Sequence, residues 1–382
     1  MTEKDTHPSS THPPLPPTSE DDQFMRLRLL RSRRVGVSTY KRLLIEHGTA
    51  QNALAALPEV ARAAGVQAYE ICPEGVVIAE LKAARRIGAR LVAQGSANYP
   101  AALNELRDAP PFLWVLGDMA TLQKPMIALV GARNASSLGT RMARALARDL
   151  GDAGYVIVSG LARGIDAAAH LASLDTGTIA VQAGGVDTIY PAENAQLAES
   201  IAQQGARVSE QPMGLQPMAR HFPARNRIIS GLARATVVVE AAAKSGSLIT
   251  ARDALDLGRD VLAVPGHPMD ARASGCNMLI RDGATLVRNA DDVLEALAPL
   301  APTSPELPLA PPAQVPQDRR TLQDTARLHQ QILSRLGPSP LAEDQLIRDL
   351  GAPTATVAPV LVELELDGSI DRAPGGLLTR AS

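Results

Sequence analysis

Cysteine is nearly absent from this chain, whose 382 residues include only Cys72 and Cys276. Two cysteines cannot build a disulfide framework, and with no CxxC pair or histidine cluster the sequence offers no ligand set for a structural zinc ion. No apolar run approaches the roughly 18 residues of a membrane-spanning helix. The chain also does not open on a signal-peptide pattern. We therefore expect a cytoplasmic protein with no membrane segment, no metal site and no cofactor.

Lysine and aromatic residues are also scarce. Five of the 38 basic residues are lysine, and the chain contains three phenylalanines. The net charge of −2 excludes a uniformly basic surface, so any contact with nucleic acid has to come from local charge. Neither GxxxxGKS nor GxxxxGKT occurs, which argues against an ATPase with a Walker A loop.

Two stretches with little to bury divide the chain. Residues 1–23 are rich in proline, serine, threonine and acidic residues, and we expect them to form a disordered tail. Residues 299–320 are rich in proline and are expected to form an extended linker. Three folded units remain: a small helical domain at 24–84, an α/β domain at 85–298 and a C-terminal domain at 321–382.

The first unit has the pattern of a helix-hairpin-helix or SAM-like domain. We expect a helix at 25–32, a turn at 35–38 and a second helix at 39–48, with Ser38 as the cap of the second helix and Gly48 as its stop. Between residues 26 and 42 there are seven basic side chains and no acidic one. They are Arg26, Arg28, Arg31, Arg33, Arg34, Lys41 and Arg42. A DNA-contacting face and a merely solvated face fit this pattern equally well.

The middle unit alternates short apolar runs with helix-length amphipathic segments. We expect strands at 126–130, 155–158, 178–181, 206–208, 235–239 and 260–264. Strands that alternate with helices predict an α/β fold with a doubly wound, largely parallel sheet of the extended Rossmann type. In such sheets ligands bind outside the carboxyl ends of the strands, which is where the functional residues should lie.

The last unit has a winged-helix pattern. Helices are expected at 321–335, 342–350 and 354–367, followed by two short strands around the Pro374-Gly375-Gly376 turn. The third helix, in the position of a recognition helix, has no lysine or arginine and carries Glu363, Glu365 and Asp367. An acidic helix is unsuited to the major groove, so contact with protein is favoured over base reading.

Three predicted strands end in glycine-rich turns. The first strand is followed by Gly131, Arg133 and Ser136, and then by a helix. Gly131 permits close backbone approach, the start of the helix offers N–H groups and Arg133 adds a cation, which together predict an anion site. The second strand ends in Ser159-Gly160 and leads to Arg163-Gly164, and the third strand leads to Gly184. Together the three turns indicate a backbone-lined groove that suits a polynucleotide.

Asp166 and His170 follow the second turn at helical spacing and would share one helix face. Either the two residues form a catalytic pair, or Asp166 is there as a favourable charge at the helix N-terminus.

The segment 216–234 contains four arginines, His221, Phe222 and no acid. Its candidate contacts are Arg220, Phe222, Arg225, Asn226 and Arg227. A basic track with an aromatic face is typical of single-strand binders, and stacking of a base on Phe222 is favoured over packing of its ring beside Ile228 and Ile229. Further on, a turn that precedes another helix offers N–H and hydroxyl donors to phosphate. Its residues are Lys244, Ser245, Gly246 and Ser247.

At this point the motifs resemble the DprA/Smf family of DNA-processing proteins. The resemblance rests on VGARNASSLGTR, SGLARGIDAAAH, GGVDTIYPAEN, HFPARNRIISGLA and VVVEAAAKSGSLITARDAL, which occur in the family's order between residues 99 and 283. It implies a protein that binds and protects single-stranded DNA in natural transformation, helps to load the RecA recombinase, and dimerises through its Rossmann domain. Arg133 matches the family's GxR arginine, and Phe222 its aromatic residue. Some members have lysine where this chain has Ala219, and Arg220 stands next to it.

Two functions are therefore in competition. The favoured one is a binding protein without catalytic activity, in which the glycines admit the DNA backbone, the cations bind phosphates and Phe222 stacks a base. The rival is a nucleotide phosphoribohydrolase of the lysine-decarboxylase-like type with Glu240 as its acid. Such enzymes carry a GGxGTxxE sequence, whereas Gly184-Gly185 is followed here by Val186-Asp187-Thr188.

Overall fold

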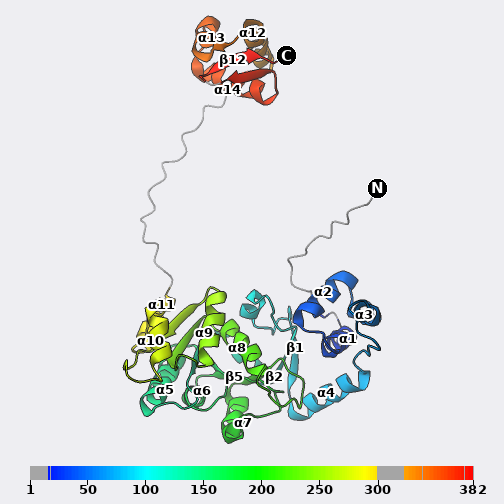
Figure 1. The fold of residues 1–382 in the computed structure, drawn as a ribbon, viewed down its shortest axis with the longest axis vertical. Coiled ribbons are helices and arrows are strands. Elements are labelled where there is room, and N and C mark those ends of the chain that lie inside the picture. The colour runs from blue at the N-terminus through cyan, green and yellow to red at the C-terminus, as the bar shows by residue number, and fades with distance from the viewer. Residues whose placement is uncertain (1–15, 18, 299–321, 338, 374, 382) are drawn as a thin grey trace. The chain divides into compact units, whose positions relative to one another are not determined.

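The computed structural model describes residues 16–17, 19–298, 322–337, 339–373 and 375–381. The expected linker and most of the expected tail lie outside these residues. The chain divides into two compact units on either side of residue 299, and each is described by itself (Figure 1).

The N-terminal helical domain begins earlier than its composition predicts. Its helices are α1 (Glu20–Arg31), α2 (Val37–His47), α3 (Ala50–Ala63) and α4 (Glu74–Ile87). The Oγ of Ser19 accepts a hydrogen bond from the Asp22 amide at 3.1 Å, so a capped first turn includes residues assigned to the tail. Helix α2 starts after Gly36 without a side-chain cap, so the assignment of Ser38 as its cap is wrong, whereas Gly48 ends the helix with a φ of 74° as expected.

Most of the basic residues between positions 26 and 42 are engaged in ion pairs. Four of the seven contact carboxylates, in the pairs Arg26–Asp22, Arg28–Glu74, Arg31–Glu80 and Arg42–Glu46. Glu80 also accepts a hydrogen bond from Trp114 Nε1 at 2.7 Å, and Trp114 and Phe112 of the sheet pack among the helices. The charged side chains thus help to join the helical domain to the sheet.

The α/β domain is built on a nine-stranded sheet of order β1-β2-β6-β5-β4-β3-β7-β8-β9. The strands are β1 (Arg90–Ala93), β2 (Phe112–Gly117), β3 (Met126–Gly131), β4 (Val156–Ser159), β5 (Thr178–Val181), β6 (Ala206–Ser209), β7 (Ala235–Glu240), β8 (Asp260–Ala263) and β9 (Thr285–Leu286). The seven strands from β3 to β9 run parallel to one another. Strands β1 and β2 add an antiparallel edge beside β6. All six expected strands are present.

Helices cover both faces of this sheet (Figure 1). They are α5 (Ser137–Asp152), α6 (Ile165–Ala172), α7 (Ala195–Gln204), α8 (His221–Leu232), α9 (Ser247–Asp256), α10 (Ser274–Arg281) and α11 (Ala290–Leu297), with short 3-10 turns η1 (Ala101–Glu105), η2 (Met119–Gln123) and η3 (Ala192–Asn194). Ile127 and Leu129 of β3 pack under α5, whereas Ala128 and Val130 pack under α8 and α9. Burial on both faces explains why the strands read as unbroken apolar runs.

The strand order reverses between β3 and β7. Helices α5 and α6 follow β3 and β4 on one face, whereas α9 follows β7 on the other. The carboxyl ends of β3 and β7 therefore flank the topological switch point, which is the usual ligand crevice of a doubly wound sheet.

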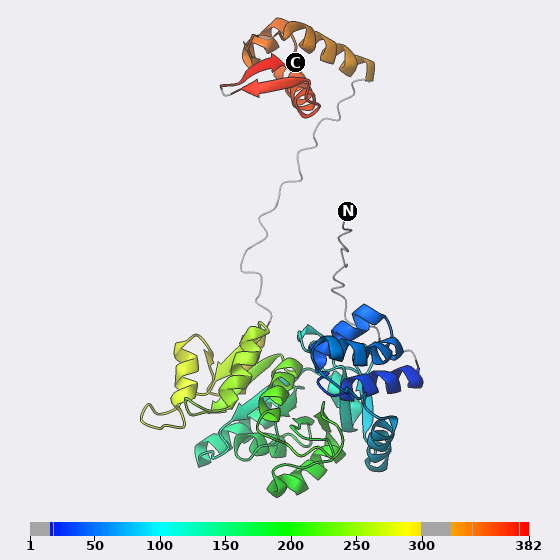
Figure 2. The same ribbon diagram turned by 45° about the vertical axis from the view of Figure 1, so that its right-hand side comes forward.

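The C-terminal unit is a winged-helix domain, as the pattern predicts. It contains α12 (Leu322–Arg335), β10 (Leu341–Ala342), α13 (Glu343–Leu350), α14 (Thr354–Leu366), β11 (Ile370–Ala373) and β12 (Leu377–Arg380). The strands form an antiparallel sheet of order β10-β12-β11, and Figure 2 shows the β11–β12 hairpin in red. Leu346, Leu361 and Leu378 lie in its fully buried core.

Both cysteines are buried and unpaired. Among the described residues, no group of three or more His, Cys, Asp or Glu side chains is placed to hold a metal ion. Within the same residues, no helix combines the length and the apolar character that a membrane crossing requires.

Candidate nucleic-acid interface

The glycine-rich turns of three predicted strands meet at one edge of the sheet, because β3, β4 and β5 are parallel neighbours. Gly164 has a φ of 76°, and a Cβ at this position would lie 2.2 Å from the Ala132 carbonyl oxygen. Ile165 N also donates to that oxygen at 3.2 Å. The turns that carry Arg133 and Arg163 are therefore in direct contact, and both arginines are exposed to solvent.

An aromatic and cationic cluster lies at this edge. The guanidinium carbon of Arg133 is 5.2 Å from the centre of the Phe222 ring, and the ring of Tyr190 lies 5.7 Å from it at a tilt of 57°. Both distances are typical of attractive contacts. Phe222 is half-buried, and Tyr190 is 51% exposed. The Phe222 ring thus lies at the surface and not in the core beside Ile228 and Ile229.

These groups surround one hollow. Its lining residues are Arg133, Gly160, Ala162, Arg163, Tyr190, Pro191, Phe222 and Arg225. The structure thus brings together residues from three strand ends and from α8, as the sequence motifs predict. Tyr190 was not singled out from the sequence, although an aromatic residue directly after a glycine-rich strand end, in a chain with few aromatics, was a usable signal.

Arg225 lines this hollow from its buried side. Its side chain is buried, and NH1 donates to the carbonyl oxygens of Gly160 at 2.5 Å and Val181 at 2.6 Å. Burial lowers the pKa of Arg225 to about 10, with a smaller contribution from the charge of Arg133, while Asp166 opposes the shift. Arg225 therefore remains a cation at neutral pH and holds the ends of β4 and β5 together.

Asp166 and His170 hold the Gly160–Gly164 turn from inside. Asp166 accepts a hydrogen bond from the Gly160 amide at 3.1 Å, and His170 Nε2 accepts one from the Leu161 amide at 3.3 Å. Leu161 has a φ of 56°, a conformation that a leucine adopts only when its surroundings enforce it. Burial raises the pKa of Asp166 and lowers that of His170 to about 3. The pair is therefore inaccessible and shapes the binding turn.

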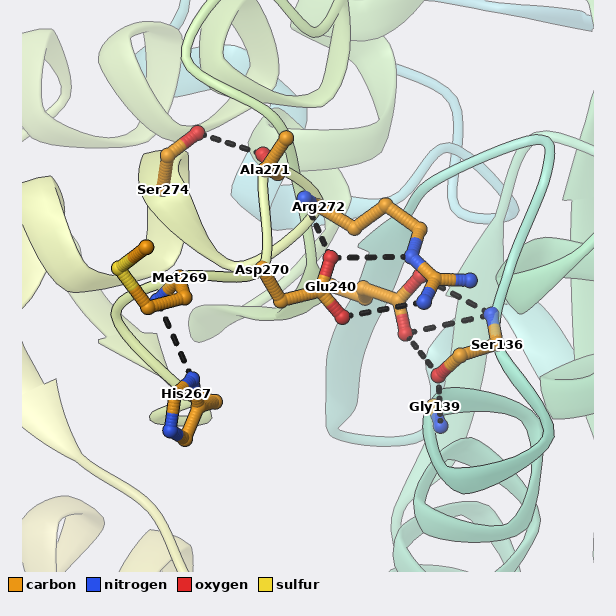
Figure 3. Close-up of polar contacts among 9 residues, drawn as sticks. All are labelled: Ser136, Gly139, Glu240, His267, Met269, Asp270, Ala271, Arg272 and Ser274. Carbon is orange, nitrogen blue, oxygen red and sulfur yellow. Dashed lines mark hydrogen bonds and ion pairs between the residues drawn. The ribbon is translucent and has the colours of Figure 1, made fainter.

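At the N-terminus of α5, where the sequence predicts free N–H groups, the amides of Ser136 and Gly139 already have partners. Ser136 donates from its amide to Glu240 Oε1 at 3.0 Å and from its hydroxyl to Oε2 at 2.5 Å, while its Oγ accepts from the Gly139 amide at 2.9 Å (Figure 3). Gly139 allows the close approach of this carboxylate, because a Cβ there would lie 2.2 Å from Glu240 Oε2. Gly131 instead packs against α6, where an added Cβ would lie 2.6 Å from Ile165 Cγ1. The carboxylate of Glu240 thus occupies the expected phosphate position.

Other candidate residues have partners within the fold. The buried hydroxyl of Ser159 donates to the Leu129 carbonyl oxygen at 2.6 Å. A Cβ at the buried Gly184 would lie 2.5 Å from the Leu215 carbonyl oxygen. Arg227 forms ion pairs with Asp108 at 3.0 Å and Glu210 at 2.5 Å. Ser159 and Arg227 therefore have structural partners in place of a phosphate.

The remaining candidates lie at or near the N-terminal ends of α8 and α9, and of these Asn226 is buried. Arg220 is exposed and immediately precedes α8, and Lys244 is exposed in the turn before α9. Ser245 and Ser247 share a hydrogen bond of 2.6 Å between their hydroxyls. Asn226 Nδ2 donates to the Gly246 carbonyl oxygen at 3.4 Å, which links this turn to α8.

The fold and the site define a class: a Rossmann-type α/β protein with cations and aromatic rings at its strand ends, flanked by a small helical domain and a winged helix. Residues 90–298 match the family model of DNA recombination-mediator protein A. Residues 20–83 and 312–376 match the DprA-like N-terminal HHH domain and the DprA winged-helix domain. The chain belongs to the DprA/Smf family.

Named relatives and solved structures agree with this assignment. Protein Smf of Escherichia coli K12 is 40% identical over 289 residues, which span 75% of this chain and 76% of the relative. DprA of Streptococcus pneumoniae R6 is 46% identical over 198 residues, 51% of this chain and 70% of the relative. The X-ray structure of DprA from Streptococcus pneumoniae superposes with a TM-score of 0.61 at 35% identity, covering 71% of this chain and 97% of that structure.

A second solved structure concerns DNA binding directly. The structure of DNA processing protein A from Helicobacter pylori, described with its single-stranded DNA binding mode, superposes with a TM-score of 0.51 at 30% identity. The superposition covers 55% of this chain and 95% of that structure.

Proposed function

We propose that this protein binds single-stranded DNA across the carboxyl edge of its sheet. The observation that supports the proposal most directly is the packing of Arg133 against Phe222, with Tyr190 beside it and Arg163 on the adjoining turn. Aromatic rings can stack on any base, and exposed arginines neutralise phosphates without reading sequence. The exposed Arg220 and Lys244 extend this charge along α8 and α9.

A salt-titrated mobility shift with oligo(dT) tests the proposal. Each phosphate contact contributes to the dependence of affinity on salt, so Arg133→Ala should weaken binding and flatten the slope of log affinity against log salt by about one. The matched control is Arg148→Ala, an exposed arginine of α5 paired with Asp149 and outside the hollow. Equal effects of the two substitutions, or no binding by the wild type at low salt, would refute the proposal.

We infer further that the protein acts as a mediator without catalysing a reaction. In the cytoplasm it would protect the strand and help to load RecA recombinase on it during transformation and recombination. Membership of a recombination-mediator family supports this role. RecA strand exchange on DNA coated with the protein should be faster than on bare DNA in the presence of a competing single-strand binder, and Arg133→Ala should abolish the gain.

Dimerisation through the Rossmann domain belongs to the same proposal. The edge strand β9 and the neighbouring α9 support it, because Leu286 is 42% exposed and Leu255 is 57% exposed. Sedimentation should give a dimer that Leu286→Arg dissociates. Leu171→Arg, at a 54% exposed leucine of α6, should leave the dimer intact. A monomeric wild type would refute this part.

The rival function, hydrolysis of a nucleoside monophosphate, requires Glu240 to donate a proton as an acid. That side chain is 8% exposed, and both its oxygens accept hydrogen bonds from Ser136. Base release by the wild type that is absent in Glu240→Gln would establish the rival.

A further inference from the structure

A second cavity lies on the other side of the Ser136–Glu240 bridge, between α5 and the 265–273 loop that follows β8. Its volume is about 540 Å³, within the range of small-molecule sites. Its lining residues include Ser136, Leu138, Met142, Ala145, Glu240 and His267. It shares no lining residue with the hollow around Phe222. Ser136 and Glu240 line the cavity and not the hollow.

Asp270 lines this cavity and forms a planar ion pair with the neighbouring Arg272. Asp270 Oδ1 accepts from Arg272 Nε at 3.1 Å, and Oδ2 accepts from NH2 at 3.0 Å, so the guanidinium and the carboxylate are held in one plane. Figure 3 shows the Arg272 side chain reaching from the 265–273 loop towards Glu240. A fixed guanidinium plane is a surface on which nucleobases stack.

The cavity also has groups that can read the edge of a base. Glu240 lines the cavity, and a carboxylate has room for more than the three contacts that Ser136 makes with it. His267 Nδ1 accepts from the Met269 amide at 3.2 Å, which places the proton of the neutral ring on Nε2 and makes it a donor. Leu138, 73% exposed, and Met142 supply apolar wall.

We infer that this cavity binds a guanine base. Guanine has adjacent N–H donors on one edge, which match the carboxylate, and the acceptors O6 and N7, which match His267. Thymine has a single N–H between two carbonyls and would leave the carboxylate opposed by acceptors. The base comes either from a bound DNA strand that crosses the bridge or from a free nucleotide. The inference rests on the proposed function for the first source and is independent of it for the second.

The test uses the full chain with two probes. In fluorescence anisotropy, a dT oligonucleotide with one central dG should bind about tenfold more tightly than pure dT, which is the size of one good base contact. In equilibrium dialysis, dGMP should bind saturably and dTMP should not. Arg272→Ala and the cavity-filling Ala145→Leu should remove both effects.

Arg281→Ala is the matched control, because Arg281 is an exposed arginine paired with its neighbour Asp282 outside the cavity. Thermal unfolding of each variant checks that it folds. A dG preference that requires Arg272 assigns the strand as the source, and dGMP binding without a strand preference assigns the free nucleotide. If neither probe favours guanine, the inference is wrong even when dT binding still depends on Arg133. If no oligonucleotide binds, the proposed function fails and the dGMP result alone decides on the cavity.

Discussion

The guanidinium of Arg225 occupies the space that a side chain at position 160 would need. A Cβ on Gly160 would lie 2.0 Å from Arg225 NH1, which is itself held by the Gly160 and Val181 carbonyl oxygens. The glycine in this turn is thus required by a cation that comes from α8, 65 residues later in the chain.

Gly160→Ala should therefore destabilise the protein. Arg225 cannot move aside without losing two buried hydrogen bonds, so we expect a loss of about 1–3 kcal/mol in the free energy of unfolding, measured with urea. Gly75→Ala is the control, since Gly75 lies in α4 with no atom within 4 Å of an added Cβ. That change should stabilise the protein by up to about 1 kcal/mol. A neutral Gly160→Ala would contradict the packing described.

Phe222→Ala should weaken single-strand binding by about 1–3 kcal/mol with the salt slope unchanged, because it removes a stacking surface and no charge. Tyr190→Ala should have a smaller effect of the same kind. Phe222→Tyr should retain most of the affinity. Titrations at several salt concentrations separate this loss from that of Arg133→Ala, and a changed slope in Phe222→Ala would argue against stacking.

His170 should make the stability of the protein pH-dependent. Its pKa is lowered to about 3 in the folded state, against 6.5 when exposed, so its contribution is present above pH 6.5 and is lost as pH falls towards 3. At pH 4 the loss is about 3 kcal/mol relative to pH 7. The raised pKa of Asp166 acts in the opposite direction, so the comparison has to be made between the wild type and a variant.

His170→Gln provides that comparison. The amide oxygen of the glutamine can still accept a hydrogen bond from the Leu161 amide, and the glutamine side chain does not titrate. The difference in the free energy of unfolding between wild type and variant should be largest at pH 7 and should shrink as the pH is lowered to 4. A constant difference across this range would show that His170 is not held neutral by the fold.

The carboxylate of Glu240 supplies a negative charge at the N-terminus of α5, so Glu240→Ala should leave a site there for an anion from solution. The variant should lose stability and recover part of it in phosphate or sulfate buffer but not in chloride. The wild type, whose site is filled, should show a smaller response to the same anions. Equal responses in thermal unfolding would contradict this role of Glu240.

Deletion of residues 320–382 should leave oligo(dT) affinity largely unchanged. Helix α14 has no basic residue, and Glu363, Glu365 and Leu366 are exposed on it. The cations proposed to bind DNA all lie in the other unit. Loss of binding in the truncated protein, with its thermal unfolding preserved, would move the DNA site to the winged helix.

Much of the architecture follows from local pattern. The six strands expected from the sequence consist largely of apolar residues because they are buried on both faces of the sheet, and β5 has the bounds expected for it. The sequence did not predict strands β1, β2 and β9. Strand β1 begins with an exposed arginine and β9 has only two residues. Strand β2 is defined by its pairing with β1 and β6. Pairing partners distant in the sequence leave little local signal.

The sequence by itself determined the family, the Rossmann fold and the edge of the sheet at which the site lies, because glycine turns after buried strands are local features. Only the tertiary structure decided which charges face the solvent. Arg133 and Arg163 lie at the surface, whereas Arg225 is buried and Arg227 is paired with acids from other segments. The physical reason is that the state of a charge depends on its neighbours in space. Ser136 and Glu240, 104 residues apart, become neighbours only when β3 and β7 pair.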